Sequence, residues 1–196
     1  MMPTIEINHI FTNFVAIDFI SNNIPDIEKF CYDLHSKDQG RSLSNVGGWQ
    51  SNDINLAQCL PKLFYDIKEK LDNLYYYFEF KDEFLISMDN AWININKKNH
   101  YNLPHHHSYG LFSGVYYVKA EGKNIGDVVF LNPCVTQSVC ISEHIIKTKN
   151  PFNSSSYTVT PKTGMILIFP SWMMHYTNPN ETDKDRISIA FNCYIK

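Results

Sequence analysis

Long hydrophobic runs, clustered cysteines and an excess of positive charge are all missing from this chain of 196 residues. The longest apolar runs, such as residues 165–169 (MILIF), are far too short to cross a membrane. The first nine residues lack the basic and apolar regions of a signal peptide. A net charge of −3 offers no basic surface. We therefore expect a cytoplasmic protein that binds neither membranes nor nucleic acid.

Cysteines are few, and they are scattered along the chain. Their number, five, is odd, and no two of them have CxxC spacing. This pattern indicates free thiols in a reducing compartment, and it argues against a zinc site or a disulfide framework. Internal repeats and linkers are absent as well. The length allows one sizeable core but not two comfortable ones, so we expect a single domain over residues 1–196.

Helical periodicity is present only in the first part of the chain. Apolar residues recur at helical spacing within residues 21–40, where Asn23 could cap a helix and Gly40 end it, and again from about residue 60 to 77. Residues 5–19 have the composition of a strand. Residues 1–83 are therefore expected to form a mainly helical N-terminal part.

Short strand-like segments follow, separated by Gly, Pro, Asn and Asp. Regular spacing of this kind favours a sandwich or barrel, and the jelly roll is its eight-stranded form. The sequence therefore predicts an α+β domain, in which a jelly-roll core at residues 84–196 has the N-terminal helices packed on one face. The expected strands cover residues 84–96, 111–120, 126–132, 138–148, 156–160, 164–170, 172–177 and 186–195.

Three consecutive histidines precede one of these strands. Residues i and i+2 of a strand share a face, so His105 and His107 would point one way and His106 the other. His175, in a late strand that could lie beside an early one, is the best third ligand. Imidazole suits iron, copper, nickel or zinc, and three protein ligands that leave open positions mark a catalytic site. The alternative is a solvated loop, the reading we prefer for the isolated His9, His35, His100 and His144.

Arg186 opens the last strand, with Ser188 two residues later on the same face. An arginine inside a barrel is costly unless an anion meets it, and its planar fork matches a carboxylate. The serine hydroxyl could add a further hydrogen bond. The alternative is an edge arginine that pairs with Asp183 or Asp185.

Together, H-x-H, a distal His and R-x-S resemble the signature of the 2-oxoglutarate- and Fe(II)-dependent oxygenases. More closely, the chain is similar to the uncharacterised "putative 2OG-Fe(II) oxygenase" family. The similarity runs from the middle of the chain to its C-terminal end, whereas the N-terminal helices match only loosely. The matching segments are GGWQS (47–51), AWININ (91–96), NLPHHHSYGLFSGVYYV (102–118), GDVVFLNP (126–133), GMILIFPSWMMHYTNPN (164–180) and RISIAFN (186–192).

The resemblance implies a double-stranded β-helix that holds Fe(II) through His105, His107 and His175. 2-Oxoglutarate would chelate the iron, and Arg186 and Ser188 would hold its far carboxylate. O2 would be consumed, succinate and CO2 released, and a C–H bond of an unidentified small molecule or peptide hydroxylated.

The chain departs from the superfamily at His107, where a carboxylate is usual. The site therefore has either three histidines, or two completed by water or by another residue such as Asp127.

Two further readings stay open. Asn94 lies on the polar face of residues 91–96 and is a candidate contact for 2-oxoglutarate or substrate, and either Tyr116 or Tyr117 should face the barrel interior. The rival functions are a three-histidine cupin-type dioxygenase without 2-oxoglutarate and a non-enzymatic jelly-roll binding module. The sequence does not decide between a monomer and a homodimer.

Overall fold

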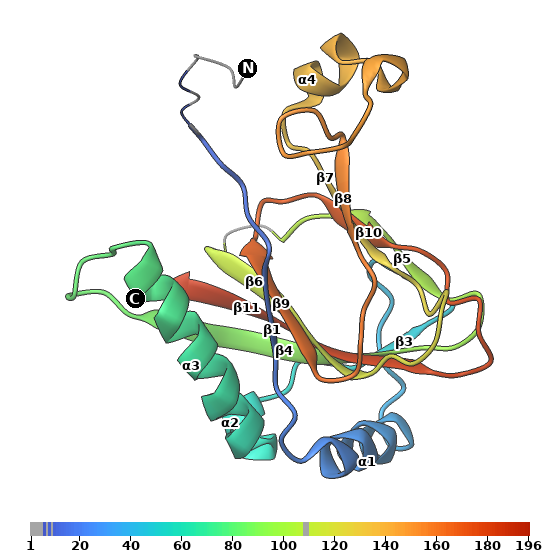
Figure 1. Ribbon diagram of the computed structural model, residues 1–196. Coiled ribbons are helices and arrows are strands. Elements are labelled where there is room, and N and C mark those ends of the chain that lie inside the picture. The colour runs from blue at the N-terminus through green and yellow to red at the C-terminus, as the bar shows by residue number, and fades with distance from the viewer. Residues whose placement is uncertain (1–5, 7, 9, 108–109) are drawn as a thin grey trace.

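Two antiparallel β-sheets face each other in the computed structural model, which describes residues 6, 8, 10–107 and 110–196 (Figure 1). No helix in the described part of the chain is long and apolar enough to cross a bilayer. The helices are α1 (Ile24–His35), α2 (Leu56–Cys59), α3 (Pro61–Tyr77) and α4 (Val135–Cys140), with a 3-10 turn at Glu143–Ile145. The strands are β1 (Ala16–Phe19), β2 (Asn45–Val46), β3 (Trp49–Gln50), β4 (Ile86–Asn96), β5 (Tyr101–His105), β6 (Phe112–Lys119), β7 (Val128–Leu131), β8 (Ser156–Val159), β9 (Met165–Pro170), β10 (His175–Thr177) and β11 (Arg186–Ile195).

Strands from distant parts of the chain alternate within each sheet. The larger sheet has the order β1-β9-β6-β11-β4-β3, and the smaller one the order β2-β5-β10-β7-β8. The last strand, β11, lies between β6 and β4 in the larger sheet, and β10 lies between β5 and β7 in the smaller one. This interleaving is that of a jelly-roll core, so the predicted α+β architecture is confirmed.

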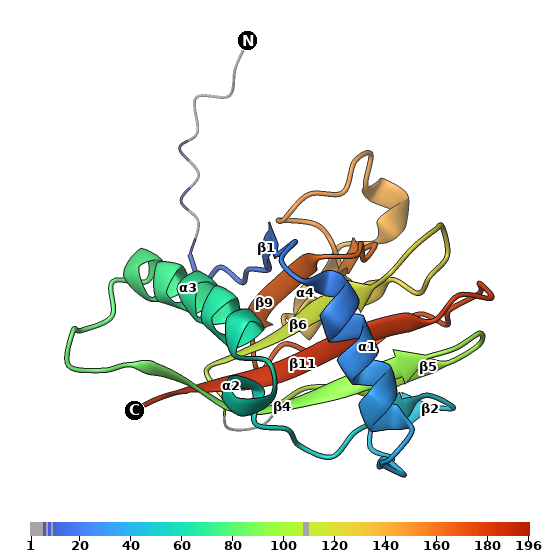
Figure 2. The same cartoon turned by 90° about the horizontal axis from the view of Figure 1, so that it is seen from below.

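Helices α1, α2 and α3 cover the outer face of the larger sheet (Figure 2). Both helices expected from the sequence are present, as α1 and α3. Ile27 of α1 and Ile67 of α3 belong to one buried cluster with Ile93 and Phe191 of the sheet. Each such side chain contributes roughly 1.5–3 kcal/mol when it is buried. This apolar layer packs on the outer face of the larger sheet, so the inner face of that sheet is available to form the site.

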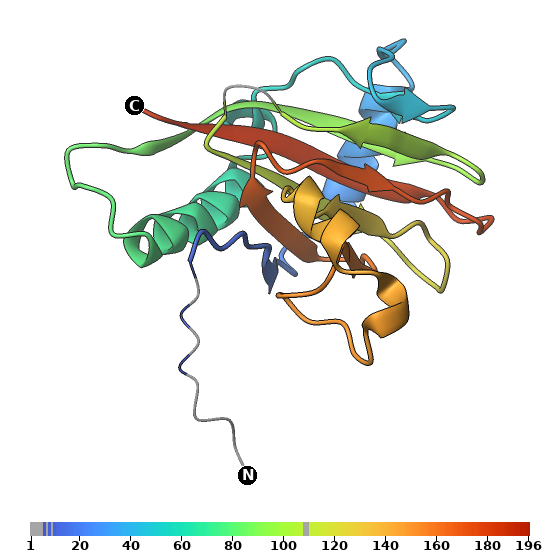
Figure 3. The same cartoon turned by 90° about the horizontal axis from the view of Figure 1, so that it is seen from above.

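One predicted strand is wrong. Residues 138–148 contain the end of α4 and a 3-10 turn, not a strand. The reason lies in packing, which decides whether residues with strand propensity form a strand. β7 pairs directly with β8, the described residues between them join neither sheet, and Ile145 among them is exposed. Figure 3 shows α4 on the side of the molecule away from α1 and α3.

The N-terminal part is not only helical. It also supplies three short strands. β1 pairs with β9 and β3 pairs with β4, at the two edges of the larger sheet, and β2 pairs with β5 at an edge of the smaller sheet. Of the strand expected at residues 5–19, only Ala16–Phe19 is a strand, and residues 5, 7 and 9 lie outside the described part. We propose that residues 1–196 form one domain, with residues 1–83 as the N-terminal part and 84–196 as the core.

Candidate functional site

A cavity of about 440 Å³ lies between the two sheets and is lined by residues of both. Side chains of the larger sheet reach it in rows, because residues opposite one another on neighbouring strands share a face. The smaller sheet contributes residues of β5, β7 and β10. The register of β4, β11 and β6 gives the rows Asn90–Asn192, Trp92–Ala190–Val115 and Asn94–Ser188–Tyr117.

Three histidines meet at one end of this cavity. His175 of β10 lies directly opposite His105 of β5, and the chain continues from β5 to His107. One ring nitrogen from each of the three lies within 4.8 Å of the others. Within the described residues this group contains no carboxylate. His106, in contrast, is exposed. The arrangement could hold one metal ion with three imidazole ligands.

Hydrogen bonds leave one nitrogen of each ring free for a metal. Nδ1 of His105 lies 2.7 Å from the carbonyl oxygen of Leu103, and Nδ1 of His175 lies 2.9 Å from that of Met173. A carbonyl oxygen can only accept, so Nδ1 must carry the proton and Nε2 keeps its lone pair. Metal-bound histidines commonly have such a partner on the second nitrogen.

Burial keeps the three rings neutral. It lowers the pKa of His105, that of His107 to about 4 and that of His175 to about 3. Proximity of the rings to one another lowers these pKa values further for His107 and His175. Because a metal ligand must be deprotonated, this environment suits metal binding at neutral pH.

We expect the metal-free protein to lose stability as the pH falls below 6.5. In the unfolded chain His175 has its ordinary pKa of 6.5, whereas in the folded protein its pKa is about 3. Between these values the unfolded state binds more protons, so the free energy of unfolding decreases with decreasing pH, by up to about 1.4 kcal/mol per unit for one histidine. Urea denaturation at pH 7, 6 and 5 with a chelator measures this slope. His175→Leu should have a shallower slope, and parallel curves for the two proteins would contradict the assignment.

At the other end of the cavity Arg186 is buried, with 3% of its surface exposed. Its Nη1 donates to the carbonyl oxygen of Gly126 at 2.6 Å, and its Nη2 to Oγ1 of Thr177 at 3.1 Å. Among the described residues none accepts a bond from Nε, and none forms an ion pair with Arg186. The Nε side of the guanidinium can therefore receive a carboxylate, which it matches in geometry.

The alternative pairing of Arg186 is wrong. Asp183 binds Lys98 at 2.9 Å, and Asp185 accepts a bond from the Tyr32 hydroxyl at 2.8 Å. Burial lowers the pKa of Arg186, and the nearby Asp127 raises it. Asp127 therefore interacts electrostatically with Arg186, and it is outside the group of three histidines.

Beside Arg186, a row of polar groups faces the cavity. Ser188 lies between Asn94 and Tyr117 on neighbouring strands. Within the described chain, neither the Ser188 nor the Tyr117 hydroxyl has a hydrogen-bond partner, and Oδ1 of Asn94 is buried without one. Tyr116 points to the other face, where its hydroxyl donates to the carbonyl oxygen of Ile20. The two hydroxyls can donate to a small anion held by the buried cation, whereas Oδ1 of Asn94 can only accept a hydrogen bond.

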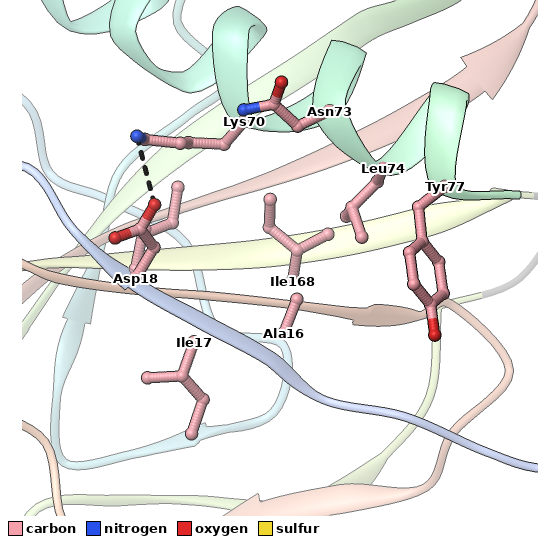
Figure 4. A pocket seen from close by; sticks show the side chains of 9 residues that line it. Ala16, Ile17, Asp18, Lys70, Asn73, Leu74, Tyr77 and Ile168 are labelled. Carbon is pink, nitrogen blue, oxygen red and sulfur yellow. Dashed lines mark ion pairs between the residues drawn. The ribbon is translucent and has the colours of Figure 1, made fainter.

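Some residues of the site carry no signal in the sequence. Thr177, Ser113 and Asn192 are single polar residues in strands, and only the register of distant strands brings them to the cavity or the histidines. A second cavity, of about 270 Å³, lies outside the barrel between β1 and α3 (Figure 4). Its polar feature is an ion pair between Asp18 and Lys70 at 3.0 Å, and no ligating cluster in the described chain adjoins it.

Several solved structures share this fold. A prolyl-4-hydroxylase from Pseudomonas putida has a TM-score of 0.65 and 10% identity, covering 93% of this chain and 94% of that one. SnoN, an α-ketoglutarate-dependent epimerase of nogalamycin biosynthesis, has a TM-score of 0.67 and 11% identity, with coverage of 93% and 76%. HygX from Streptomyces hygroscopicus, with nickel and 2-oxoglutarate bound, has a TM-score of 0.59 and 12% identity, with coverage of 93% and 83%.

These low identities show the fold, whereas the sequence itself identifies the family. No curated protein matches the chain. Residues 90–192, which include the three histidines, Arg186 and Ser188, match the family model "Putative 2OG-Fe(II) oxygenase". That match spans more than half of the 196 residues. The chain therefore belongs to this family of oxygenases and is an oxidoreductase that depends on Fe(II) and 2-oxoglutarate.

Proposed function

We propose that the protein hydroxylates a C–H bond of a small molecule or peptide, with Fe(II) held by His105, His107 and His175. The observation that carries this proposal is the convergence of three neutral imidazoles at one end of a cavity, whose other end holds a buried arginine with no ion-pair partner in the described part of the chain. Neither the cupin-type reading nor a binding module gives that arginine a task.

The donor set fits the cofactors. Three imidazole nitrogens suit Fe(II) and leave open positions for other ligands. When bound, iron and 2-oxoglutarate supply the oxidising chemistry, in which O2 is consumed and succinate and CO2 are released. The protein's own residues bind the iron and 2-oxoglutarate, orient the substrate and exclude water from the site.

The polar residues beside Arg186 can bind the cosubstrate. Arg186 grips the far carboxylate of 2-oxoglutarate through its free Nε side, and Ser188 adds a hydroxyl donor. Asn94 and Tyr117, on either side of Ser188, can each donate to the same anion. Trp92, in the next row toward the histidines, lies with its ring 5.5 Å from that of His107 and shields the metal end from water.

We place the protein in the cytoplasm. All five cysteines are free, and Cys31 and Cys193 are buried within the core. Burial raises the pKa of the Cys31 thiol to about 12, so that it stays protonated and unreactive. Thiols in this state are typical of a reducing compartment.

Turnover of 2-oxoglutarate without substrate tests the proposed function. Purified protein with Fe(II), ascorbate and O2 should convert 2-oxoglutarate into succinate, and His175→Ala should not, because one of three ligands is gone. Succinate is measured by mass spectrometry against a sample without iron. Equal succinate with and without iron, or in His175→Ala, would contradict the proposal.

His106→Ala is the matched control. It removes an imidazole from the same triplet, but His106 is exposed and outside the group of converging nitrogens. Iron affinity and succinate formation should therefore stay close to those of the wild type. A loss as large as that of His175→Ala would mean that the register of β5 is shifted by one residue.

A further inference from the structure

His107 is held in place differently from the other two histidines. The rings of His105 and His175 are oriented by backbone carbonyl oxygens two residues earlier. Nδ1 of His107 instead meets two side chains, Oδ1 of Asn192 at 2.6 Å and Oγ of Ser113 at 2.9 Å. A backbone carbonyl survives any substitution, but a side-chain partner does not. The orientation of His107 therefore depends on the identity of its neighbours.

A carboxylate near the end of this series of hydrogen bonds favours one direction for them. Nδ2 of Asn90 donates to Oδ2 of Asp53 at 3.4 Å, and Asp53 forms an ion pair with Arg41. An ionised carboxylate can only accept, so Asn90 must turn its amide nitrogen toward it. Oδ1 of Asn90 then faces Asn192, whose Nδ2 donates to it at 3.1 Å. This leaves Oδ1 of Asn192 pointing at His107.

Serine hydroxyls reinforce the same direction. Oγ of Ser113 donates to Oδ1 of Asn192 at 2.8 Å and lies 2.8 Å from Oγ of Ser171. Both serines are fully buried, and Asn192 lies opposite Ser113 and Asn90 in the sheet, at an irregularity in the pairing of β11 with β4. Such bulges re-aim side chains next to active sites. Oδ1 of Asn192 is thus a fixed acceptor, and Nδ1 of His107 must be the donor.

We propose that Asn192 is a positioning residue, which through its Oδ1 holds His107 in the tautomer that presents an unprotonated Nε2 to the metal. The inference rests on the proposed function, because it assumes that His107 is a metal ligand. Outer partners of ligating histidines orient the ring, and their loss typically costs about 10–100-fold in metal affinity.

Three variants separate the acceptor from mere packing. Asn192→Ala removes the acceptor, whereas Asn192→Asp keeps an acceptor oxygen but loses the amide that donates to Asn90. Asn132→Ala is the control, since Asn132 is also partly buried, makes three hydrogen bonds and lies outside the cavity lining. The affinity for Ni²⁺, a redox-stable probe, is measured by calorimetry. The tautomer of His107 in the metal-free protein is read from its ¹⁵N shifts.

We expect Asn192→Ala to bind Ni²⁺ about 10–100-fold more weakly, with Asn192→Asp and Asn132→Ala close to the wild type. The metal-free wild type should carry the proton of His107 on Nδ1, and Asn192→Ala should show both tautomers. Wild-type affinity in Asn192→Ala would overturn the inference, as would equal losses in the Ala and Asp variants. If Asn192→Ala does not fold, a proton on Nε2 in the wild type, or a weakly binding Asn192→Asp, overturns it instead.

His107→Ala, measured in parallel, separates this inference from the proposed function. If His107→Ala binds Ni²⁺ like the wild type, the three-histidine site itself is wrong. If His107→Ala loses the metal and Asn192→Ala does not, only the role of Asn192 is refuted.

Discussion

Arg186→Ala is expected to abolish measurable binding of 2-oxoglutarate while the protein still folds and binds metal. Arg186 is the buried cation at the far end of the cavity, and its Nε donates to no acceptor among the described residues. Losing a buried charge-assisted contact costs on the order of 2–5 kcal/mol, which is at least about 30-fold in affinity. Calorimetric titration of 2-oxoglutarate into the Ni²⁺-loaded protein measures the loss.

Metal binding should survive this change, because Arg186 and the histidines are held by different contacts. The guanidinium is hydrogen-bonded to Gly126 and Thr177, whereas the rings of His105 and His175 are hydrogen-bonded to the carbonyl oxygens of Leu103 and Met173. The affinity of Arg186→Ala for Ni²⁺ should therefore equal that of the wild type.

Arg186→Lys is the matched control for charge. Lysine keeps the positive charge on a single ammonium group but lacks the planar guanidinium that can donate two hydrogen bonds to one carboxylate. The affinity of Arg186→Lys for 2-oxoglutarate should therefore fall between those of the wild type and the alanine variant. Unchanged 2-oxoglutarate affinity in Arg186→Ala would refute the role of the arginine. A joint loss of Ni²⁺ and 2-oxoglutarate would show that the substitution disturbs the whole site.

The parts of the site that the sequence predicts are those encoded by local spacing. His105 and His107 share a face because they are two residues apart in an extended segment, and Arg186 and Ser188 share one for the same reason. The place of His175 beside His105 was inferred from jelly-roll strand order, and the pairing of β10 with β5 produces it.

The parts that escape prediction depend on register between distant strands. Asn192 and Asn90 are 102 residues apart, and only the pairing of β11 with β4 brings their amides together. Tyr117 and Tyr116 are equivalent in the sequence until the register of β6 decides which of them faces the cavity. The prediction of a strand at 138–148 fails for a related reason, since the segment has strand propensity but β7 pairs directly with β8 and the described residues between them join neither sheet.

His107 is the position at which the chain departs from the superfamily, and replacing it should have the largest effect on the metal. If it is the third ligand, His107→Ala removes a direct bond, and the loss of Fe(II) affinity should exceed the about 10–100-fold typical of outer-shell partners. The three converging nitrogens and the depressed pKa of about 4 for His107 favour this case.

His107→Asp distinguishes a three-histidine site from a two-histidine site completed by water. In the first case the carboxylate recreates the two-histidine, one-carboxylate arrangement that suits Fe(II), so much of the affinity lost in His107→Ala should return. In the second case His107→Ala would bind Fe(II) almost normally, and the aspartate would bind more tightly than the wild type, because it adds both a ligand and a charge. Anaerobic Fe(II) titrations of both variants, with 2-oxoglutarate present, give the comparison. We expect the first result, since an imidazole buried beside two others, with its Nδ1 bonded to Asn192 and Ser113, directs its remaining lone pair at the shared site. Wild-type affinity in His107→Ala would reject it.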